Sequence, residues 1–85
     1  MIKFSFVIQD KQGIHARPAG ILVKTAGQFK SAATMHCNNK SADLKRVFAV
    51  MSLGVKAGML VTVQVEGEDE VAAKAAIESC LKSNL

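Results

Sequence analysis

The stretch AATMHCNNKSAD, residues 32–43, predicts a β-hairpin. Two short runs, residues 32–37 and 40–43, flank Asn38-Asn39, and asparagine is a residue type that two-residue hairpin turns favour. A hairpin holds its two strands antiparallel. The centre of the chain is therefore expected to belong to an antiparallel sheet, and the flanking segments decide what else the fold contains.

Two further segments alternate as strands do. Residues 2–8 read IKFSFVI, with apolar even positions and polar residues at two of the three odd positions. Residues 60–65 read LVTVQV and are rich in β-branched side chains. Each pattern indicates a strand with one face on a core. The sheet is thus expected to have four strands.

Helical periodicity marks three other segments. The first segment, residues 16–28, places Ala16, Ala19, Val23 and Ala26 in an apolar stripe along one helical face, and Gly27 is its expected end. The second is only about two turns long, ends at Gly54, and has helical spacing at Leu44, Val47, Phe48 and Met51. The third is expected to start at Asp69, with its carboxylate accepting from free N–H groups there, and to bury Ala73, Ile77, Cys80 and Leu81.

The predicted element order is therefore βαββαβα. Strands that are apolar on one side only, alternating with helices, imply two layers. We expect an α+β fold, an open-faced sandwich with three helices on one face of a four-stranded antiparallel sheet. With 85 residues and no linker-like stretch, the chain is expected to be a single domain over residues 1–85.

The charge is distributed unevenly. The net charge is +4, yet residues 1–65 carry nine Lys and Arg against two acids, and residues 11–42 contain no acid. The locally positive electrostatic field around residues 11–42 favours anions and acidic partner surfaces. The chain has neither an apolar run long enough to cross a bilayer nor a signal-peptide pattern, so a cytoplasmic location without membrane insertion is expected.

The cysteines and the second histidine do not indicate a metal centre. Cys37 and Cys80 are expected to be reduced, half-buried thiols, and His36 beside Cys37 has no further ligand at metal-binding spacing. His36 is expected to face solvent without a role. We expect no metal and no cofactor.

The segment GIHARPA, residues 13–19, carries the candidate chemistry. A histidine at a helix start lies beside unpaired N–H groups and the positive end of the helix dipole, which suits an anion such as a phosphoryl group on His15. Arg17 supplies a nearby cation, and Pro18 suits a first helical turn. If His15 and Arg17 are considered alone, the more ordinary interpretation is that both are solvent-exposed surface residues with no chemical role.

This segment resembles the active site of the HPr family, the histidine-containing phosphocarriers of the phosphoenolpyruvate-dependent sugar phosphotransferase system. Residues 44–54, LKRVFAVMSLG, resemble that family's second-helix region, and residues 66–70, EGEDE, resemble its entry to the last helix. The likeness spans nearly the whole chain, and the βαββαβα order is also the HPr order.

The resemblance implies a phosphocarrier without independent turnover. His15 would accept a phosphoryl group at Nδ1 from phosphorylated enzyme I, charged by phosphoenolpyruvate, and pass it to enzyme II A domains during sugar uptake. Arg17 would steady the phosphate, and the phosphate-binding residues would be Ala16, Arg17 and Pro18. The partner-docking residues would be Gly20, Lys24, Gly27, Arg46, Val47, Phe48 and Met51. A monomer is expected.

One departure concerns regulation. Many members of the family carry a serine, phosphorylated by a dedicated kinase, where this chain has Arg46. A cation cannot be that switch and would strengthen docking to acidic partners. We therefore expect no kinase control at this position.

Three alternatives remain open at this stage. A regulatory or nitrogen-branch paralogue would use the same His15 chemistry on a different acceptor. A small nucleic-acid-binding domain is suggested by the pI near 9.3, but the chain has no Tyr or Trp and no basic cluster larger than Lys45-Arg46. A hydrolase is the weakest, because no carboxylate pair, Ser-His-Asp set or metal cluster accompanies His15.

Overall fold

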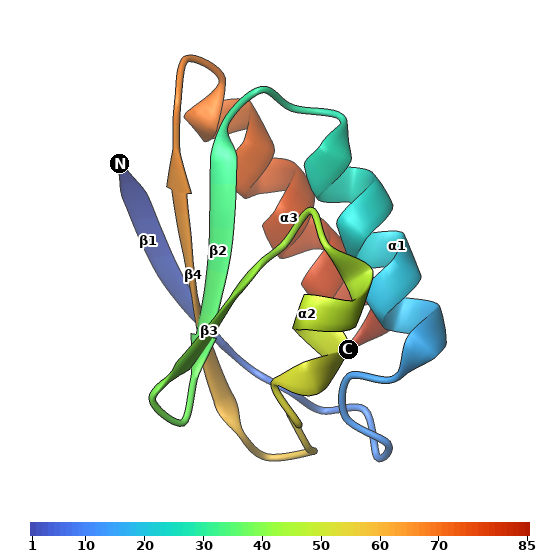
Figure 1. Ribbon diagram of the computed structural model, residues 1–85. Coiled ribbons are helices and arrows are strands. Elements are labelled where there is room, and N and C mark those ends of the chain that lie inside the picture. The colour runs from blue at the N-terminus through green and yellow to red at the C-terminus, as the bar shows by residue number, and fades with distance from the viewer.

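A computed structural model describes all residues 1–85 and contains the predicted elements in the predicted order (Figure 1). The strands are β1 (Ile2–Val7), β2 (Ala32–Cys37), β3 (Lys40–Asp43) and β4 (Leu60–Glu66). The helices are α1 (Ala16–Gly27), α2 (Val47–Ser52) and α3 (Glu70–Asn84). The α+β class is confirmed. None of the helices has the length and apolar character that crossing a membrane requires.

The strands form one antiparallel sheet in the order β1-β4-β2-β3. The β2–β3 hairpin closes as predicted, with Cys37 opposite Lys40 and positive φ values of 52° at Asn38 and 64° at Asn39. Two left-handed residues in succession match the twist of the flanking strands, which explains the choice of asparagine. All three helices cover one face of the sheet, and the other face is open (Figure 1).

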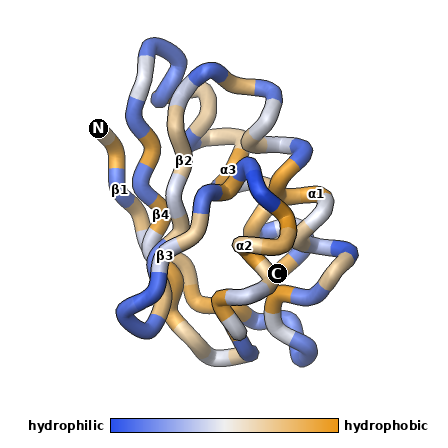
Figure 2. The backbone as a smooth tube through the Cα atoms, in the orientation of Figure 1, coloured by the Kyte–Doolittle hydropathy of each residue, from blue (hydrophilic) through white to orange (hydrophobic).

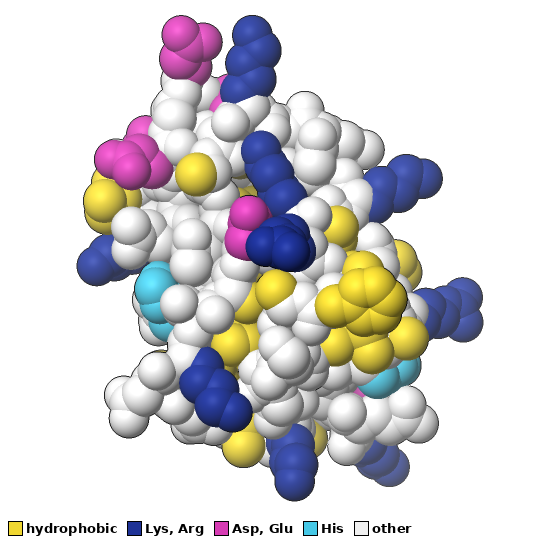
Figure 3. Space-filling model, in the orientation of Figure 1, with side chains coloured by type: hydrophobic (Ala, Val, Ile, Leu, Met, Phe, Trp, Pro, Cys, Tyr) yellow, Lys and Arg dark blue, Asp and Glu magenta, His cyan; other side chains and the backbone are white.

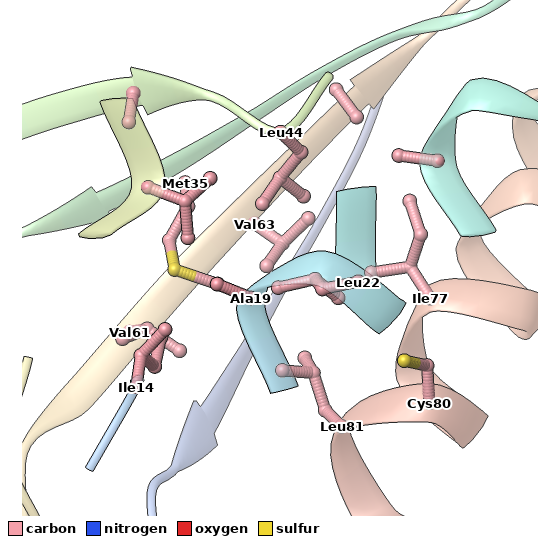
Figure 4. Close-up of a cluster of buried hydrophobic side chains, with 14 of the residues drawn as sticks. Ile14, Ala19, Leu22, Met35, Leu44, Val61, Val63, Ile77, Cys80 and Leu81 are labelled. Carbon is pink, nitrogen blue, oxygen red and sulfur yellow. The ribbon is translucent and has the colours of Figure 1, made fainter. Parts of the chain in front are cut away.

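The core lies between the sheet and the helices (Figure 4). The inward side chains of β4 meet those of α1 and α3; the central members are Leu22, Val61, Val63, Ile77 and Leu81, all fully buried. The hydropathy colouring mixes hydrophobic and hydrophilic residues along the helices and marks the turn between β2 and β3 as hydrophilic (Figure 2). The expected buried stripe of α3 is confirmed, and both cysteines are free but buried, not half-buried.

Two helical stripes differ from prediction. In α1, Ala16 is exposed and Leu22 is buried in its place, because Ala16 is the first helical residue and lies at the open end of the helix. In α2, only Val50 is buried, whereas Phe48 is 82% exposed. Helical spacing alone could not show that a two-turn helix keeps an apolar face in solvent.

Asp69 lies at the N-cap of α3, but its carboxylate does not cap that helix. It accepts instead from the backbone N–H groups of Lys30 and Ser31, each at 2.9 Å, and from the Ser31 hydroxyl. The Ser31 hydroxyl, followed by the Lys30 N–H, lowers the pKa of Asp69 from 3.8 to about 2. The carboxylate thus ties the segment after α1 to the segment before α3, which corrects the predicted capping role.

Candidate functional site

The turn before α1 is held in place by Gly13. Its φ of +67° favours glycine, and a Cβ there would lie only 2.2 Å from the carbonyl oxygen of Val55. The next N–H, that of Ile14, donates to the same oxygen at 3.1 Å, and the Ile14 side chain is buried. The backbone is therefore anchored immediately before His15.

His15 is the N-cap residue of α1, with extended backbone at φ −115°, and its ring makes no capping hydrogen bond. The side chain is 37% exposed. The first helical hydrogen bond runs from Ala19 N–H to the His15 carbonyl at 3.0 Å, so the N–H groups of Ala16 and Arg17 have no partner within the protein. A partly exposed imidazole thus lies beside two unpaired donors and a helix dipole, the arrangement predicted from GIHARPA.

Pro18 differs from the other two predicted phosphate-binding residues. Its nitrogen carries no hydrogen, so it cannot donate to a phosphoryl oxygen. It is buried at the third position of α1, where a helix leaves an N–H unpaired in any case. Pro18 therefore shapes the start of the helix and does not supply a donor.

A shallow depression surrounds the imidazole, lined by Asp10, His15, Arg17, Pro18, Ile21 and Asn84. It brings His15 and Arg17 together, as predicted, and adds three residues that sequence reasoning missed. Ile21 could have been found, since it lies one helical turn after Arg17. Asp10 and Asn84 come from the preceding turn and from α3, and only the tertiary structure brings them here.

The predicted docking residues lie on α1 and α2, two helices that pack side by side, or at the N-cap of α2. Gly20, Lys24 and Gly27 are exposed on α1. On α2 and at its N-cap, Arg46, Phe48 and Met51 are exposed and Val47 is half-buried. Figure 3 shows hydrophobic side chains grouped at this side of the molecule with Lys and Arg around them. We call these seven residues, together with Ile21, the α1–α2 face.

His36 does not join the site. It is exposed on β2, opposite Ser41 and Thr62 of the neighbouring strands, and thus on the open face of the sheet. No group of three or more His, Cys, Asp or Glu side chains is close enough to hold a metal ion.

Comparison with known proteins gives one consistent result. Residues 2–83 match a family model described as "PTS HPr component phosphorylation site". The chain is 42% identical over 81 residues to the phosphocarrier protein HPr of Mycoplasma capricolum subspecies capricolum, covering 95% of this chain and 91% of that protein.

Solved structures agree. A histidine-containing phosphocarrier protein from Mycoplasma superposes with a TM-score of 0.94 at 40% identity, covering 96% of this chain and 93% of that one. An HPr dimer from Thermoanaerobacter tengcongensis gives a TM-score of 0.78 at 37% identity, covering 98% and 95% of the two chains.

Proposed function

This chain belongs to the HPr family of the phosphotransferase system, and from that premise we propose that it accepts a phosphoryl group on His15 from phosphorylated enzyme I and passes it to enzyme II A domains. The observation that carries the proposal is the partly exposed imidazole of His15, which makes no capping hydrogen bond and lies beside the partnerless N–H groups of Ala16 and Arg17.

The chemistry needs one nucleophile and a cradle for an anion. A ring nitrogen of His15 forms a bond to phosphorus as the bond from phosphorus to the donor histidine breaks, and the reverse exchange delivers the group to the acceptor. The free N–H groups and the Arg17 guanidinium offset the charge on the phosphoryl oxygens. No water is activated and no product is released, so the chain acts as a carrier without turnover of its own.

The α1–α2 face supports docking around this site. It combines apolar side chains, above all Phe48, with the cations Lys24 and Arg46. Arg17 lies next to it in the depression around His15, and residues 11–42 contain no acid. An apolar centre with a charged rim is the usual build of a transient protein interface. The face therefore fits partners that present an apolar patch with acidic surroundings.

Arg46 bears on regulation as well. Its side chain is exposed at the start of α2 and makes no capping hydrogen bond. A guanidinium cannot be phosphorylated by a serine kinase, so we propose that this position carries no kinase switch. Its positive charge instead attracts acidic partners at all times.

We further propose that the protein works in the cytoplasm as a single-domain monomer. The related HPr from Thermoanaerobacter tengcongensis has been solved as a dimer, so the monomer requires its own measurement. Light scattering after size exclusion at micromolar concentration should give the mass of one 9.0 kDa chain. A mass of twice that value would contradict this part of the proposal.

The test of the main proposal uses enzyme I, phosphoenolpyruvate and a purified enzyme II A domain. The protein should gain an acid-labile, base-stable phosphoryl group that the A domain then removes. His15→Ala should take up none, whereas His36→Ala, which changes the other histidine, should behave as the wild type. Equal labelling of the wild type and His15→Ala would overturn the proposal.

A further inference from the structure

Asp10 is the acidic residue beside the candidate nucleophile. Its carboxylate oxygen Oδ2 lies 3.7 Å from Nε2 of His15, and the two side chains are 29% and 37% exposed. This separation exceeds a hydrogen bond and is within the range of an ion pair when the imidazole carries its second proton. Contacts of this kind in unliganded sites are often long and shorten when the reacting complex forms. The next acid along the chain is Asp43, so nothing nearby in the sequence duplicates this carboxylate.

The direction of the Asp10 carboxylate is set by the turn that carries it. Its other oxygen, Oδ1, accepts from the Gln12 N–H at 2.8 Å, and its backbone carbonyl accepts from the Gly13 N–H at 2.9 Å. One carboxylate oxygen is therefore held by the turn, and the other is left facing the imidazole. Gly13 and Ile14, both fixed against Val55, connect this turn to His15.

The imidazole has both an acid and a cation near it. Asp10 lies at Nε2, Arg17 lines the same depression as the ring, and the N–H groups of Ala16 and Arg17 at the start of α1 are free. A carboxylate near Nε2 favours the tautomer that carries its proton there, which leaves the lone pair on Nδ1. The same carboxylate offsets the positive charge that the ring acquires once Nδ1 is bonded to phosphorus.

We propose that Asp10 is a positioning residue that holds the proton on Nε2 of His15 and so makes Nδ1 the nucleophile; this rests on the proposed function. In charging, the Nδ1–P bond forms as the donor's N–P bond breaks, and the Nε2 proton stays in place. In delivery, the Nδ1–P bond breaks as the acceptor's bond to phosphorus forms. His15 then leaves as a neutral imidazole that keeps its Nε2 proton.

The test compares Asp10→Asn with a matched control. Asn retains an amide oxygen for the Gln12 N–H and removes the negative charge. Asp43→Asn is the control, because the Asp43 carboxylate accepts from the Lys45 N–H at 2.8 Å in the same two-residue arrangement, far along the chain from His15. Thermal melting of all variants checks that the fold is kept.

The first readout is the tautomer of the unphosphorylated ring, measured from its ¹⁵N shifts above the pH at which the imidazole is charged. In the wild type, His15 should carry its proton mainly on Nε2. Asp10→Asn should shift His15 toward a mixture, while His36, within the same spectrum, and Asp43→Asn should show no change. Asp10→Glu should recover part of the wild-type ratio.

The second readout is the rate of charging by enzyme I and phosphoenolpyruvate, which should fall about two- to fivefold in Asp10→Asn, the range expected for a partly exposed charge contact. An unchanged tautomer ratio, an unchanged rate, or a wild-type ring protonated mainly on Nδ1 overturns the inference about Asp10. Failure of the wild type to take up any phosphoryl group instead overturns the proposed function, and the tautomer measurement still decides whether Asp10 orders the ring.

Discussion

Phe48→Ala separates docking from folding. The Phe48 side chain is 82% exposed, so its removal takes almost no packing from the core and should change the free energy of unfolding by less than about 0.5 kcal/mol. The same exposure makes it the largest apolar group available to a partner on the α1–α2 face. A loss in transfer without a loss in stability would therefore identify an interface residue.

The expected loss of partner affinity in Phe48→Ala follows from the apolar surface area that a partner would cover. Covering the exposed part of a phenylalanine removes on the order of 120–150 Å² of mostly apolar surface from water, worth about 3 kcal/mol at 25 cal/mol per Å². Alanine keeps the Cβ, and an interface realises only part of such a gain. We expect a loss of about 2 kcal/mol in partner affinity, roughly 30-fold.

The assay is phosphoryl transfer from enzyme I at varied concentrations of the carrier, with thermal melting alongside. Val71→Ala is the control, because Val71 is 73% exposed on α3, outside the α1–α2 face. Phe48→Ala should raise KM about 30-fold at unchanged melting temperature, and Val71→Ala should change neither. An unchanged KM in Phe48→Ala, or an equal rise in both variants, would show that Phe48 is not an interface residue.

The other predictions concern the supports of the site. Leu22→Ala should lower the free energy of unfolding by about 3 kcal/mol in urea titration, because Leu22 is fully buried between α1 and the sheet; a loss below 1 kcal/mol would contradict that packing. Gly13→Ala should lower the free energy of unfolding by on the order of 2–3 kcal/mol and slow the charging of His15, because the new Cβ would clash with the Val55 carbonyl oxygen. A variant that melts and is charged like the wild type would contradict this role of Gly13. The pKa of Asp69 is about 2 in the folded protein and near 3.8 in the unfolded chain, so the unfolded chain binds a proton more readily. The contribution of Asp69 to the free energy of unfolding is therefore complete above about pH 4 and is lost as the pH falls toward 2. Urea midpoints of Asp69→Asn should accordingly lie below those of the wild type at neutral pH and approach them near pH 2; a constant difference would contradict the assignment. Incubation with ATP and an HPr serine kinase should leave the protein unmodified, and a stoichiometric phosphoserine would show that Arg46 does not abolish such control.

The sequence predicted those features that depend on local periodicity. The Asn38-Asn39 hairpin, the order of the elements and the buried face of α3 all follow from patterns within a few residues, and the structure confirms them. The position of His15 at the start of α1 followed in the same way. These features require no knowledge of which segments meet in space.

The features that were missed depend on contacts between distant segments. The Asp69 carboxylate accepts from the N–H groups of Lys30 and Ser31, 39 and 38 residues away, and does not cap its own helix. These donors lie in the connection between α1 and β2, which the fold brings next to the connection between β4 and α3. Asp10 faces His15 only because the turn between β1 and α1 folds back on the helix start. The exposure of Phe48 depends on how little of α2 the core can cover.

We propose that His15, through Nδ1, carries the transferable phosphoryl group. The most direct measurement is a ¹⁵N–³¹P coupling experiment on protein labelled at histidine and charged by enzyme I and phosphoenolpyruvate. We expect one phosphorus per chain, coupled to Nδ1 of His15 and absent after exchange with an enzyme II A domain. Phosphorus coupled to Nε2, or bound to His36, would contradict it.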